Sequence, residues 1–428
     1  MYDLAIIGAG WAGFNAALRA KEFNLSVCLI DQDALGGVCL NQGCIPTKTL
    51  IQSAKVYSLI KKSSLFGVEI DAARLDLNKV LERKEKIIRQ LASGMQFMLK
   101  GVDFVNAHAE FLSANEIKAG ERIIQAKNII IATGSSALEL PQLKFDQSGI
   151  LSSTQLLNIK SIPEKLLVIG GGVIGCEFAS LFAALGSKVT LVEKCPQLLP
   201  GVDAEIARKL ENVFKKRGLE VKTNHQVSKS DTCNYTLSLL CVGRAPSFSG
   251  LGLEKLGLKL EKNKIVIDDY LATSVPNIYF AGDCTAKLML AHYAAYQGRL
   301  AVDNILGKKI KADNAVVPNC IFTDPQISTL GLSESEAEAK GLNIKINKFD
   351  FLASAAARIL DETDGFIKVI SDKDTGQLLG ASVIGPQACE LSAVFSVVFS
   401  AHLKIEDLRR MIFAHPTLAE SVQECLKS

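Results

Sequence analysis

No apolar run in this 428-residue sequence approaches the roughly 20 residues that a membrane-spanning helix requires. Neither sign of charge dominates, since 48 lysines and arginines stand against 45 aspartates and glutamates, so the composition predicts no binding to nucleic acid or to an anionic membrane. The eleven cysteines lack metal-ligand spacing, and no metal site is predicted. Small molecules and other proteins are therefore the expected partners.

The length of the chain predicts several domains, and its first residues bear on its location. The chain is too long for one ordinary core, so several domains are expected, and 48% hydrophobic residues with 32 glycines is typical of a glycine-rich α/β protein. Residues 1–7 already form a predicted strand and leave no room for a signal or transit peptide. We therefore predict a soluble protein in the reducing cytoplasm.

Two cysteines, Cys39 and Cys44, lie five positions apart in the run GGVCLNQGCIPTK at residues 36–48. Pro46 suits the first turn of a helix that we predict to continue to about residue 62. Cys44 would then lie at a helix N-terminus, where the backbone dipole favours a thiolate. The pair is interpreted as a redox dithiol rather than as two unrelated core cysteines.

A strand, a glycine-rich turn and a helix occur twice in the sequence. The first unit joins strand 3–7 to helix 14–21, and the second joins strand 165–169 to helix 176–185. Their glycines are Gly8, Gly10 and Gly13 in the first turn and Gly170, Gly172 and Gly175 in the second. The next strand of each unit ends in an acid, Asp31 or Glu193, which follows the first glycine by 23 residues (8 to 31 and 170 to 193). Such glycines let a pyrophosphate approach a helix N-terminus while the acid accepts a ribose hydroxyl, so two dinucleotide-binding units are predicted.

Candidate ligands also follow two other predicted strands. Strand 128–131 runs into a turn at Thr133 and Gly134, and the segment 273–283 delivers the carboxylate of Asp283. Ligands of open α/β sheets bind at such strand ends. The alternative for Asp283 is a cap on the helix that follows.

The C-terminal part carries a candidate acid-base pair. His415 precedes a predicted helix, and Glu420 is placed to receive one of its ring N–H groups, which leaves the other nitrogen to face thiols. Before this pair, residues 365–370 and 378–386 flank a polar turn and predict an antiparallel hairpin.

Together these motifs resemble the class I pyridine nucleotide-disulfide oxidoreductases, most closely the dihydrolipoamide dehydrogenases. The resemblance implies an α/β fold with two doubly wound Rossmann-like dinucleotide-binding domains and a C-terminal α+β dimerisation domain. The implied divisions are an FAD-binding domain at residues 1–145 and 266–312, a shortened NAD-binding domain at 146–265 and an interface domain at 313–428. The implied assembly is a homodimer.

The resemblance also assigns the site. The first unit would hold FAD with Gly8, Gly10, Gly13, Asp31 and Asp283, and the second would hold NAD with Gly170, Gly172, Gly175 and Glu193. Further implied cofactor contacts are Gly37, Thr133, Gly134, Gly243 and Ala291, and Lys48 and Glu177 would pair beside the flavin. An acid at Glu193 favours NAD, because it would repel the 2′-phosphate of NADP.

The implied reaction oxidises dihydrolipoamide, or the lipoyl domain of a 2-oxo acid dehydrogenase complex, and reduces NAD through FAD. Substrate would attack near Cys39, Cys44 would lie against the flavin, and His415 with Glu420 would take up a proton in the opposite subunit's site.

Some features depart from the family pattern and keep alternatives open. Only residues 225–235 remain where relatives carry extra hairpin strands, Phe413 stands where dihydrolipoamide dehydrogenases often have histidine, and the segment 353–358 has few polar residues. A different NAD(P)H-dependent reductase of a glutathione-like or mixed disulfide is the second hypothesis. An inactive flavin-binding subunit is the third.

Overall fold

The computed structural model describes residues 1–146, 149–261, 264–313 and 316–427, which form two compact units. The first unit comprises Met1–Ser53, Asp76–Leu138 and Gly243–Asp313, and the second comprises Ala54–Leu75, Glu139–Val242 and Asn314–Ser428. The first unit therefore resumes at Gly243.

The first unit is built on a sheet with the strand order β3-β2-β1-β6-β5-β4, to which β16 adds beside β6. The central strand β1 (Tyr2–Ile7) pairs in parallel with β2 (Val27–Asp31) and β6 (Arg122–Ile131), as expected for apolar strands that are covered on both faces. The other strands of the unit are β3 (Asp103–Asn106), β4 (Ala109–Ser113), β5 (Glu116–Ala119), β7 (Ser135–Ala137), β13 (Arg244–Pro246), β14 (Leu260–Glu261), β15 (Lys264–Ile265) and β16 (Ile278–Phe280).

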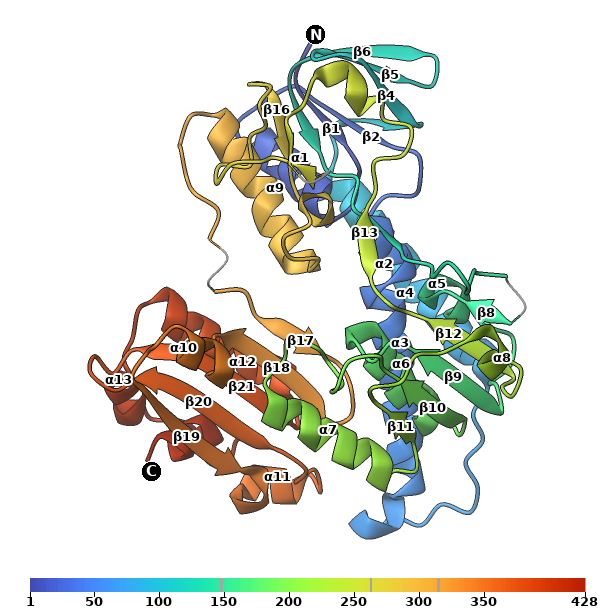
Figure 1. Cartoon of the computed structure of the whole chain (residues 1–428), viewed down its shortest axis with the longest axis vertical. Helices are drawn as coiled ribbons and strands as arrows, with labels where there is room; N and C mark the ends of the chain where they lie inside the picture. Colours follow the sequence, from blue (N-terminus) through green and yellow to red (C-terminus); the bar gives the residue numbers. More distant parts are fainter. Residues whose placement is uncertain (147–148, 262–263, 314–315, 428) are drawn as a thin grey trace. The chain divides into compact units, whose positions relative to one another are not determined.

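Successive side chains of β1 point to opposite faces of the sheet and pack in two separate parts of the core. Leu4 and Ile6 pack with helices α1 (Trp11–Glu22) and α9 (Ala291–Ile305), which lie side by side in Figure 1. Gly298 permits this approach, because a Cβ there would come 2.1 Å from the carbonyl oxygen of Ala12. The remaining helices are α2 (Gly37–Gln42), α3 (Cys44–Lys61), which crosses into the second unit, α4 (Leu77–Met98) and the 3-10 helices η2 (Leu253–Leu256) and η3 (Asp283–Thr285).

The second unit contains a five-stranded parallel sheet with the order β11-β10-β9-β12-β8. Its strands are β8 (Ile150–Leu151), β9 (Lys165–Ile169), β10 (Lys188–Val192), β11 (Glu220–Lys222) and β12 (Leu237–Leu240). Its helices are α5 (Ser153–Leu156), α6 (Val173–Ala184), α7 (Ala204–Lys216) and α8 (Lys229–Thr232). Between β11 and β12 the chain forms only the single turn of α8, where the sequence predicted a shortened connection.

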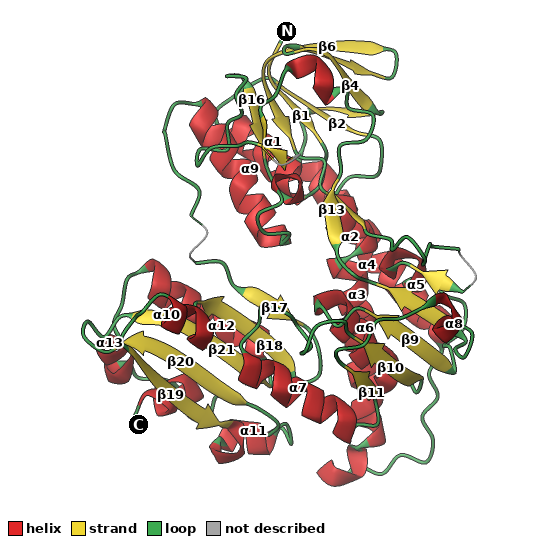
Figure 2. Cartoon of the chain, viewed as in Figure 1, coloured by secondary structure: helices red, strands yellow, loops and turns green. Residues whose placement is uncertain are grey.

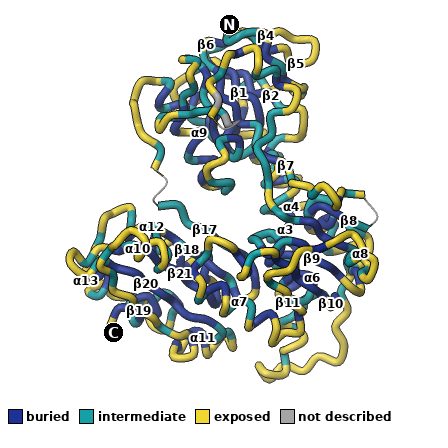
Figure 3. Tube along the Cα trace, in the orientation of Figure 1, coloured by how far each residue is buried: buried dark blue, intermediate teal, exposed yellow. Residues whose placement is uncertain are grey.

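A five-stranded antiparallel sheet, β17-β18-β21-β20-β19, completes the second unit (Figure 2). The predicted hairpin is confirmed, since β20 (Phe366–Asp372) and β21 (Leu378–Gly385) pair in antiparallel, and both are largely buried in Figure 3. The other strands are β17 (Asn319–Ile321), β18 (Gln326–Gly331) and β19 (Ile344–Asp350). The helices are η1 (Ser63–Phe66), α10 (Glu334–Ala339), η4 (Phe351–Ala353), α11 (Ala355–Ile359), α12 (Ala388–Ser400), α13 (Ile405–Arg410) and α14 (Glu420–Leu426). Across the described ranges, no helix combines the length and the apolar character needed to cross a membrane.

Candidate active site

The two glycine turns have nearly the same backbone geometry. Gly10 precedes α1 with φ −70° and ψ −171°, and Gly172 precedes α6 with φ −74° and ψ −170°. A Cβ at Gly13 or at Gly175 would come 1.8 Å from the carbonyl oxygen of the first glycine of its turn, so each turn closes tightly on its helix. Neither helix N-terminus is capped by the side chain of its N-cap residue. The amides of both first turns therefore suit an anionic ligand.

The acids Asp31 and Glu193 stabilise these turns in the same way. Each carboxylate accepts the N–H of the residue after the first glycine and the N–H two positions after itself, at 2.6 and 2.9 Å for Asp31 and 2.6 and 2.7 Å for Glu193. Burial raises the pKa of Asp31, although its backbone hydrogen bonds act in the opposite direction. The two units that repeat in the sequence therefore also form the same two hydrogen bonds in the structure.

Both turns leave room for a dinucleotide. A Cβ at Gly172 would meet no atom within 4 Å, and a Cβ at Gly10 would have the Cα of Gly37, at 3.9 Å, as its nearest neighbour. Open space next to an uncapped helix N-terminus is what a pyrophosphate needs. The residues present therefore fit FAD and NAD.

Three of the other predicted cofactor contacts of the first unit lie at the ends of the two-stranded β7–β13 ribbon. The hydroxyl of Thr133 donates to the carbonyl of Ser247 at 2.7 Å, and Gly134 takes φ +71° at the turn into β7. The carbonyl of Gly243 accepts a backbone N–H at the far end of this ribbon. Ala291 is the first residue of α9.

The sequence did not predict a role for Ser135 and Arg244, which are linked by hydrogen bonds to the predicted cofactor contact Asp283. The Ser135 hydroxyl donates to Asp283 Oδ2 at 2.6 Å, and Arg244 Nε donates to the same hydroxyl oxygen at 2.8 Å. Burial lowers the pKa of Arg244, while its attraction to Asp283 and to Cys44 acts in the opposite direction. Arg244 therefore places a positive charge near both Asp283 and the dithiol. No local sequence pattern signals these linked hydrogen bonds, because Ser135 and Arg244 are 109 positions apart.

The dithiol spans two short helical segments. Cys39 lies in α2, and Cys44 is the first residue of α3, which confirms its predicted place at a helix N-terminus. The hydrogen bond with Cys44 and burial together raise the pKa of Cys39. Nearby Lys48 opposes this shift.

Helix α2 packs directly on the first glycine turn. The N–H of Gly36 donates to the carbonyl of Ala9 at 2.9 Å, and a Cβ on Gly37 would come 2.7 Å from the Cα of Gly10. The dithiol is therefore fixed against the turn that suits a pyrophosphate. Burial acts in the same direction at Cys284, where it raises the pKa to about 12.

His415 and Glu420 form the predicted hydrogen bond, with 2.8 Å between Nδ1 and Oε2. The second carboxylate oxygen accepts the N–H of Thr417 at 3.1 Å, which fixes the orientation of Glu420 at the start of α14. The bond to His415 lowers the pKa of Glu420. The peptide before Pro416 is cis. Because 73% of the His415 side chain is exposed, its other ring nitrogen is accessible to an incoming group.

Two predicted pairings join residues of different units and stay predictions. Lys48 belongs to the first unit, whereas Glu177 is buried in α6 of the second, where its Oε1 accepts the N–H of Phe322 at 2.9 Å. The approach of His415 to the dithiol likewise joins the second unit to the first.

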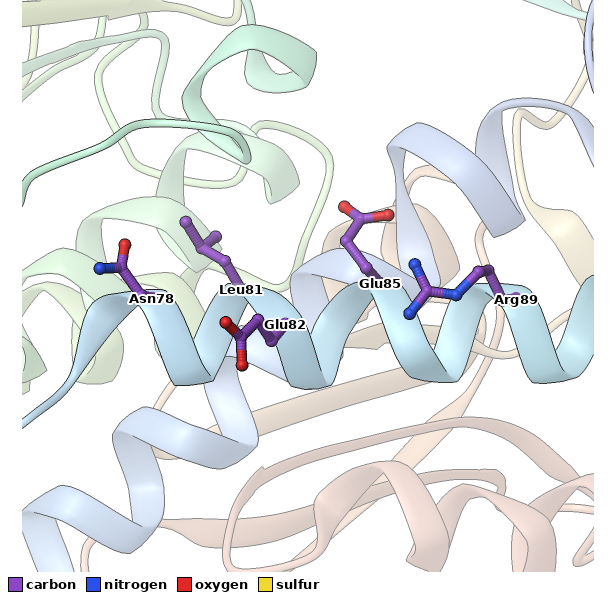
Figure 4. Close-up of a pocket in the computed structure, with 5 residues that line it drawn as sticks. All are labelled: Asn78, Leu81, Glu82, Glu85 and Arg89. Atoms are coloured by element: carbon purple, nitrogen blue, oxygen red, sulfur yellow. The ribbon is translucent and has the colours of Figure 1, made fainter.

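A surface hollow on α4 is separate from these residues. Figure 4 shows its lining side chains along the helix: Asn78, Leu81, Glu82, Glu85 and Arg89. It contains none of the predicted site residues. In the part of the chain that the structure describes, no cluster of three or more histidine, cysteine or acidic side chains could hold a metal ion.

Known proteins match this sequence over nearly its whole length. Residues 2–298 match the family model for pyridine nucleotide-disulphide oxidoreductases, and residues 317–426 match the dimerisation domain of that family. The dihydrolipoyl dehydrogenase of Bacillus subtilis is 36% identical over 448 aligned positions, which cover 99% of this chain and 98% of the relative. The mitochondrial dihydrolipoyl dehydrogenase of Homo sapiens is 35% identical, with 99% and 89% covered.

Solved structures give the same result. LpdA from Mycobacterium tuberculosis superposes with a TM-score of 0.91 at 27% identity, covering 99% of this chain and 98% of that chain. The HOCl-induced flavoprotein disulfide reductase RclA from Escherichia coli reaches 0.89 at 29% identity, with 99% of both chains covered. These matches confirm the predicted fold class and the cofactors FAD and NAD(H), and the dimerisation domain supports a homodimer. This chain belongs to the pyridine nucleotide-disulphide oxidoreductase family.

Proposed function

We propose that this protein is a dihydrolipoamide dehydrogenase that reduces NAD. The observation that carries the proposal is the Cys39–Cys44 dithiol, packed on the glycine turn of one dinucleotide-binding unit in a chain that contains a second such unit. The dihydrolipoyl dehydrogenases among its relatives, at 35 and 36% identity over nearly the whole chain, support this substrate.

The cofactors divide between the two glycine turns in this proposal. FAD binds the first turn through Gly8, Gly10, Gly13 and Asp31, in a domain of residues 1–145 and 266–312. NAD binds the second through Gly170, Gly172, Gly175 and Glu193, in residues 146–265, and residues 313–428 form the interface domain. Glu193 selects NAD because its carboxylate, already held by two backbone N–H groups, would repel a 2′-phosphate.

Cys39 and Cys44 carry out the thiol–disulfide exchange with the substrate. In the oxidised enzyme, a substrate thiolate attacks the Sγ of Cys39, and the Cys39–Cys44 bond breaks with its electron pair passing to Cys44. The second substrate thiolate then attacks the substrate sulfur bound to Cys39, which closes the lipoamide disulfide and releases Cys39 as a thiolate. Bound FAD supplies the acceptor for the two electrons of the dithiol and their transfer as hydride to NAD. Placing Cys44 at the N-terminus of α3 favours its charged form.

His415 is the base that takes up the substrate proton. Glu420 accepts the proton on Nδ1, which orients the ring and leaves Nε2 to act. In this proposal His415 serves the dithiol of the partner subunit. The substrate is free dihydrolipoamide or a lipoyl domain of a 2-oxo acid dehydrogenase complex. We also infer a cytoplasmic location, because a dithiol that cycles between its thiol and disulfide forms suits a reducing compartment.

A reductase of another disulfide is the second candidate. The similarity to RclA, named a flavoprotein disulfide reductase, favours it, as does Phe413 two residues before His415. An inactive flavin-binding subunit is the weaker alternative, because the dithiol and the His415–Glu420 hydrogen bond both remain intact.

A matrix of steady-state assays tests the proposal. Purified protein should be yellow with one FAD per chain, and kcat/KM should be highest for dihydrolipoamide with NAD. Glutathione disulfide with NADH and with NADPH forms the comparison, and the Cys44→Ser variant is the inactive control. Faster turnover with glutathione disulfide would favour the second candidate, and a flavin-loaded protein inactive with every pair would favour the third.

A further inference from the structure

The carboxylate of Asp283 does not cap a helix. Gly282 is the N-cap residue of η3 and Leu290 is that of α9, the two helices that follow β16. Among the described residues, the Ser135 hydroxyl is the one donor to this carboxylate, and it bonds to Oδ2. Oδ1 has no donor there and is not sealed in the core, so it can accept a hydrogen bond from a ligand.

Arg244 fixes the direction of the Ser135–Asp283 hydrogen bond. A guanidinium only donates and a carboxylate only accepts, so a hydroxyl between the two can satisfy both in one orientation alone. Ser135 accepts the Nε–H of Arg244 at 2.8 Å and turns its own proton toward Asp283 Oδ2 at 2.6 Å. Without the arginine, the hydroxyl could rotate this proton away from Asp283.

The β7–β13 ribbon holds the guanidinium in place. Arg244 lies opposite Ala137 in the strand register, and its side chain reaches two positions along the ribbon to Ser135. Nη2 also donates to the backbone carbonyl of Ser135, so the planar guanidinium is bound at two points. Ser135 is only 7% exposed, and hydrogen bonds are electrostatically stronger away from water. The orientation of Asp283 is therefore built into the ribbon.

We propose that Arg244 and Ser135 are positioning residues for FAD, which hold Oδ2 of Asp283 so that its Oδ1 accepts a hydrogen bond from a hydroxyl of the flavin's polyol chain. The family resemblance implies that Asp283 contacts FAD, and the two further residues determine how its carboxylate is turned. This role rests on the proposed binding of FAD to the first unit, whichever disulfide is the substrate. Both residues act through Asp283 and not on the reacting atoms.

Exchange of bound FAD for isotopically labelled FAD in excess measures how fast each holoprotein releases the cofactor. Ser135→Ala removes one oxygen atom and should speed release about ten- to hundredfold, the effect of losing a hydrogen bond to a charged group. Arg244→Met should have a similar effect. Ser136→Ala is the matched control, because Ser136 is the next residue of β7 and is exposed, and it should leave the rate unchanged. An unchanged rate in the Ser135→Ala protein would overturn the proposal.

An Asp283→Ala background separates positioning from a general effect on the fold. Asp283→Ala should itself speed FAD release, and Ser135→Ala should add nothing further in that background, because residues that act through one group are not additive. Full acceleration by Ser135→Ala in the Asp283→Ala protein would refute the proposal, as would release at the parent rate from the Asp283→Ala protein. This comparison does not need Arg244→Met, so it decides the question even where that protein fails to fold.

FAD release involves no disulfide substrate, so the proposed function can fail separately. A protein that passes both tests but is inactive with dihydrolipoamide and NAD would refute the dehydrogenase assignment and leave the role of Arg244 and Ser135 intact. A Ser135→Ala protein that releases FAD at the parent rate, in an enzyme that oxidises dihydrolipoamide, would do the reverse.

Discussion

Lys368 is buried in β20 among three carboxylates, and its replacement should strongly destabilise the second unit. Only 1% of its side chain is exposed. Its Nζ lies 3.0 Å from both Asp203 and Glu205 at the start of α7 and 2.5 Å from Glu334 of α10. The ammonium thus joins the antiparallel sheet to the helix that follows the Glu193 strand.

The expected loss in the free energy of unfolding follows from the burial of the carboxylates that contact Lys368. Lys368→Met would leave the carboxylate of Asp203, which is 4% exposed, without its cation, and breaking a buried pair in this way costs about 3 to 5 kcal/mol. Lys348 is a matched control, because it lies directly opposite Lys368 in the strand register and also pairs with Glu205, at 3.1 Å. Its side chain is 41% exposed, so Lys348→Met should cost less than about 1 kcal/mol.

The pH dependence of this contribution can also be stated. Burial lowers the pKa of Lys368, but its hydrogen bonds to Glu334, Asp203 and Glu205 outweigh burial and raise it. A raised lysine pKa stabilises the fold fully below the unfolded value and loses that stabilisation only as pH rises through the folded value. The difference between Lys368→Met and the parent should therefore be constant near neutral pH and shrink only in strong alkali.

Thermal unfolding at equal protein concentration, followed by circular dichroism, measures the loss of stability. Hydrogen exchange at the amides of α7 and β20 locates it, since the two units need not unfold together. Equal destabilisation by Lys368→Met and Lys348→Met, or full protection of α7 in the Lys368→Met protein, would refute the argument.

Four predictions concern the chemistry. Cys39→Ser should leave Cys44 as a thiolate beside oxidised flavin and give a long-wavelength charge-transfer band, whereas Cys44→Ser should not; a band in both variants would reverse or remove the assigned roles. Glu193→Ala should narrow the preference for NAD over NADP in kcat/KM, and a parent enzyme that prefers NADPH would contradict the role of Glu193. His415→Ala should slow the lipoamide half-reaction by about 10² to 10⁴ while electron transfer from flavin to NAD survives. Heterodimers of His415→Ala and Cys44→Ser chains should regain activity, and mixed dimers as inactive as their parents would exclude a shared site.

Local sequence patterns were sufficient for much of the fold. The strand-turn-helix units, the N-terminus of α3 at Cys44 and the β20–β21 hairpin depend on apolar periodicity, glycine conformation and Pro46, which act over a few residues. The His415–Glu420 hydrogen bond could be predicted for the same reason, since its members are five positions apart. The assignment of each glycine turn to its cofactor came from the family resemblance instead.

Only the tertiary structure decided which distant side chains meet. The Ser135–Asp283 hydrogen bond spans 148 positions, and the contact of Lys368 with Asp203 spans 165. The close approach of Gly37 to Gly10 depends on how α2 packs against the glycine turn. No spacing rule predicts such pairs, because strand register and helix packing set them, and these depend on burial of the whole core rather than on neighbours in the chain.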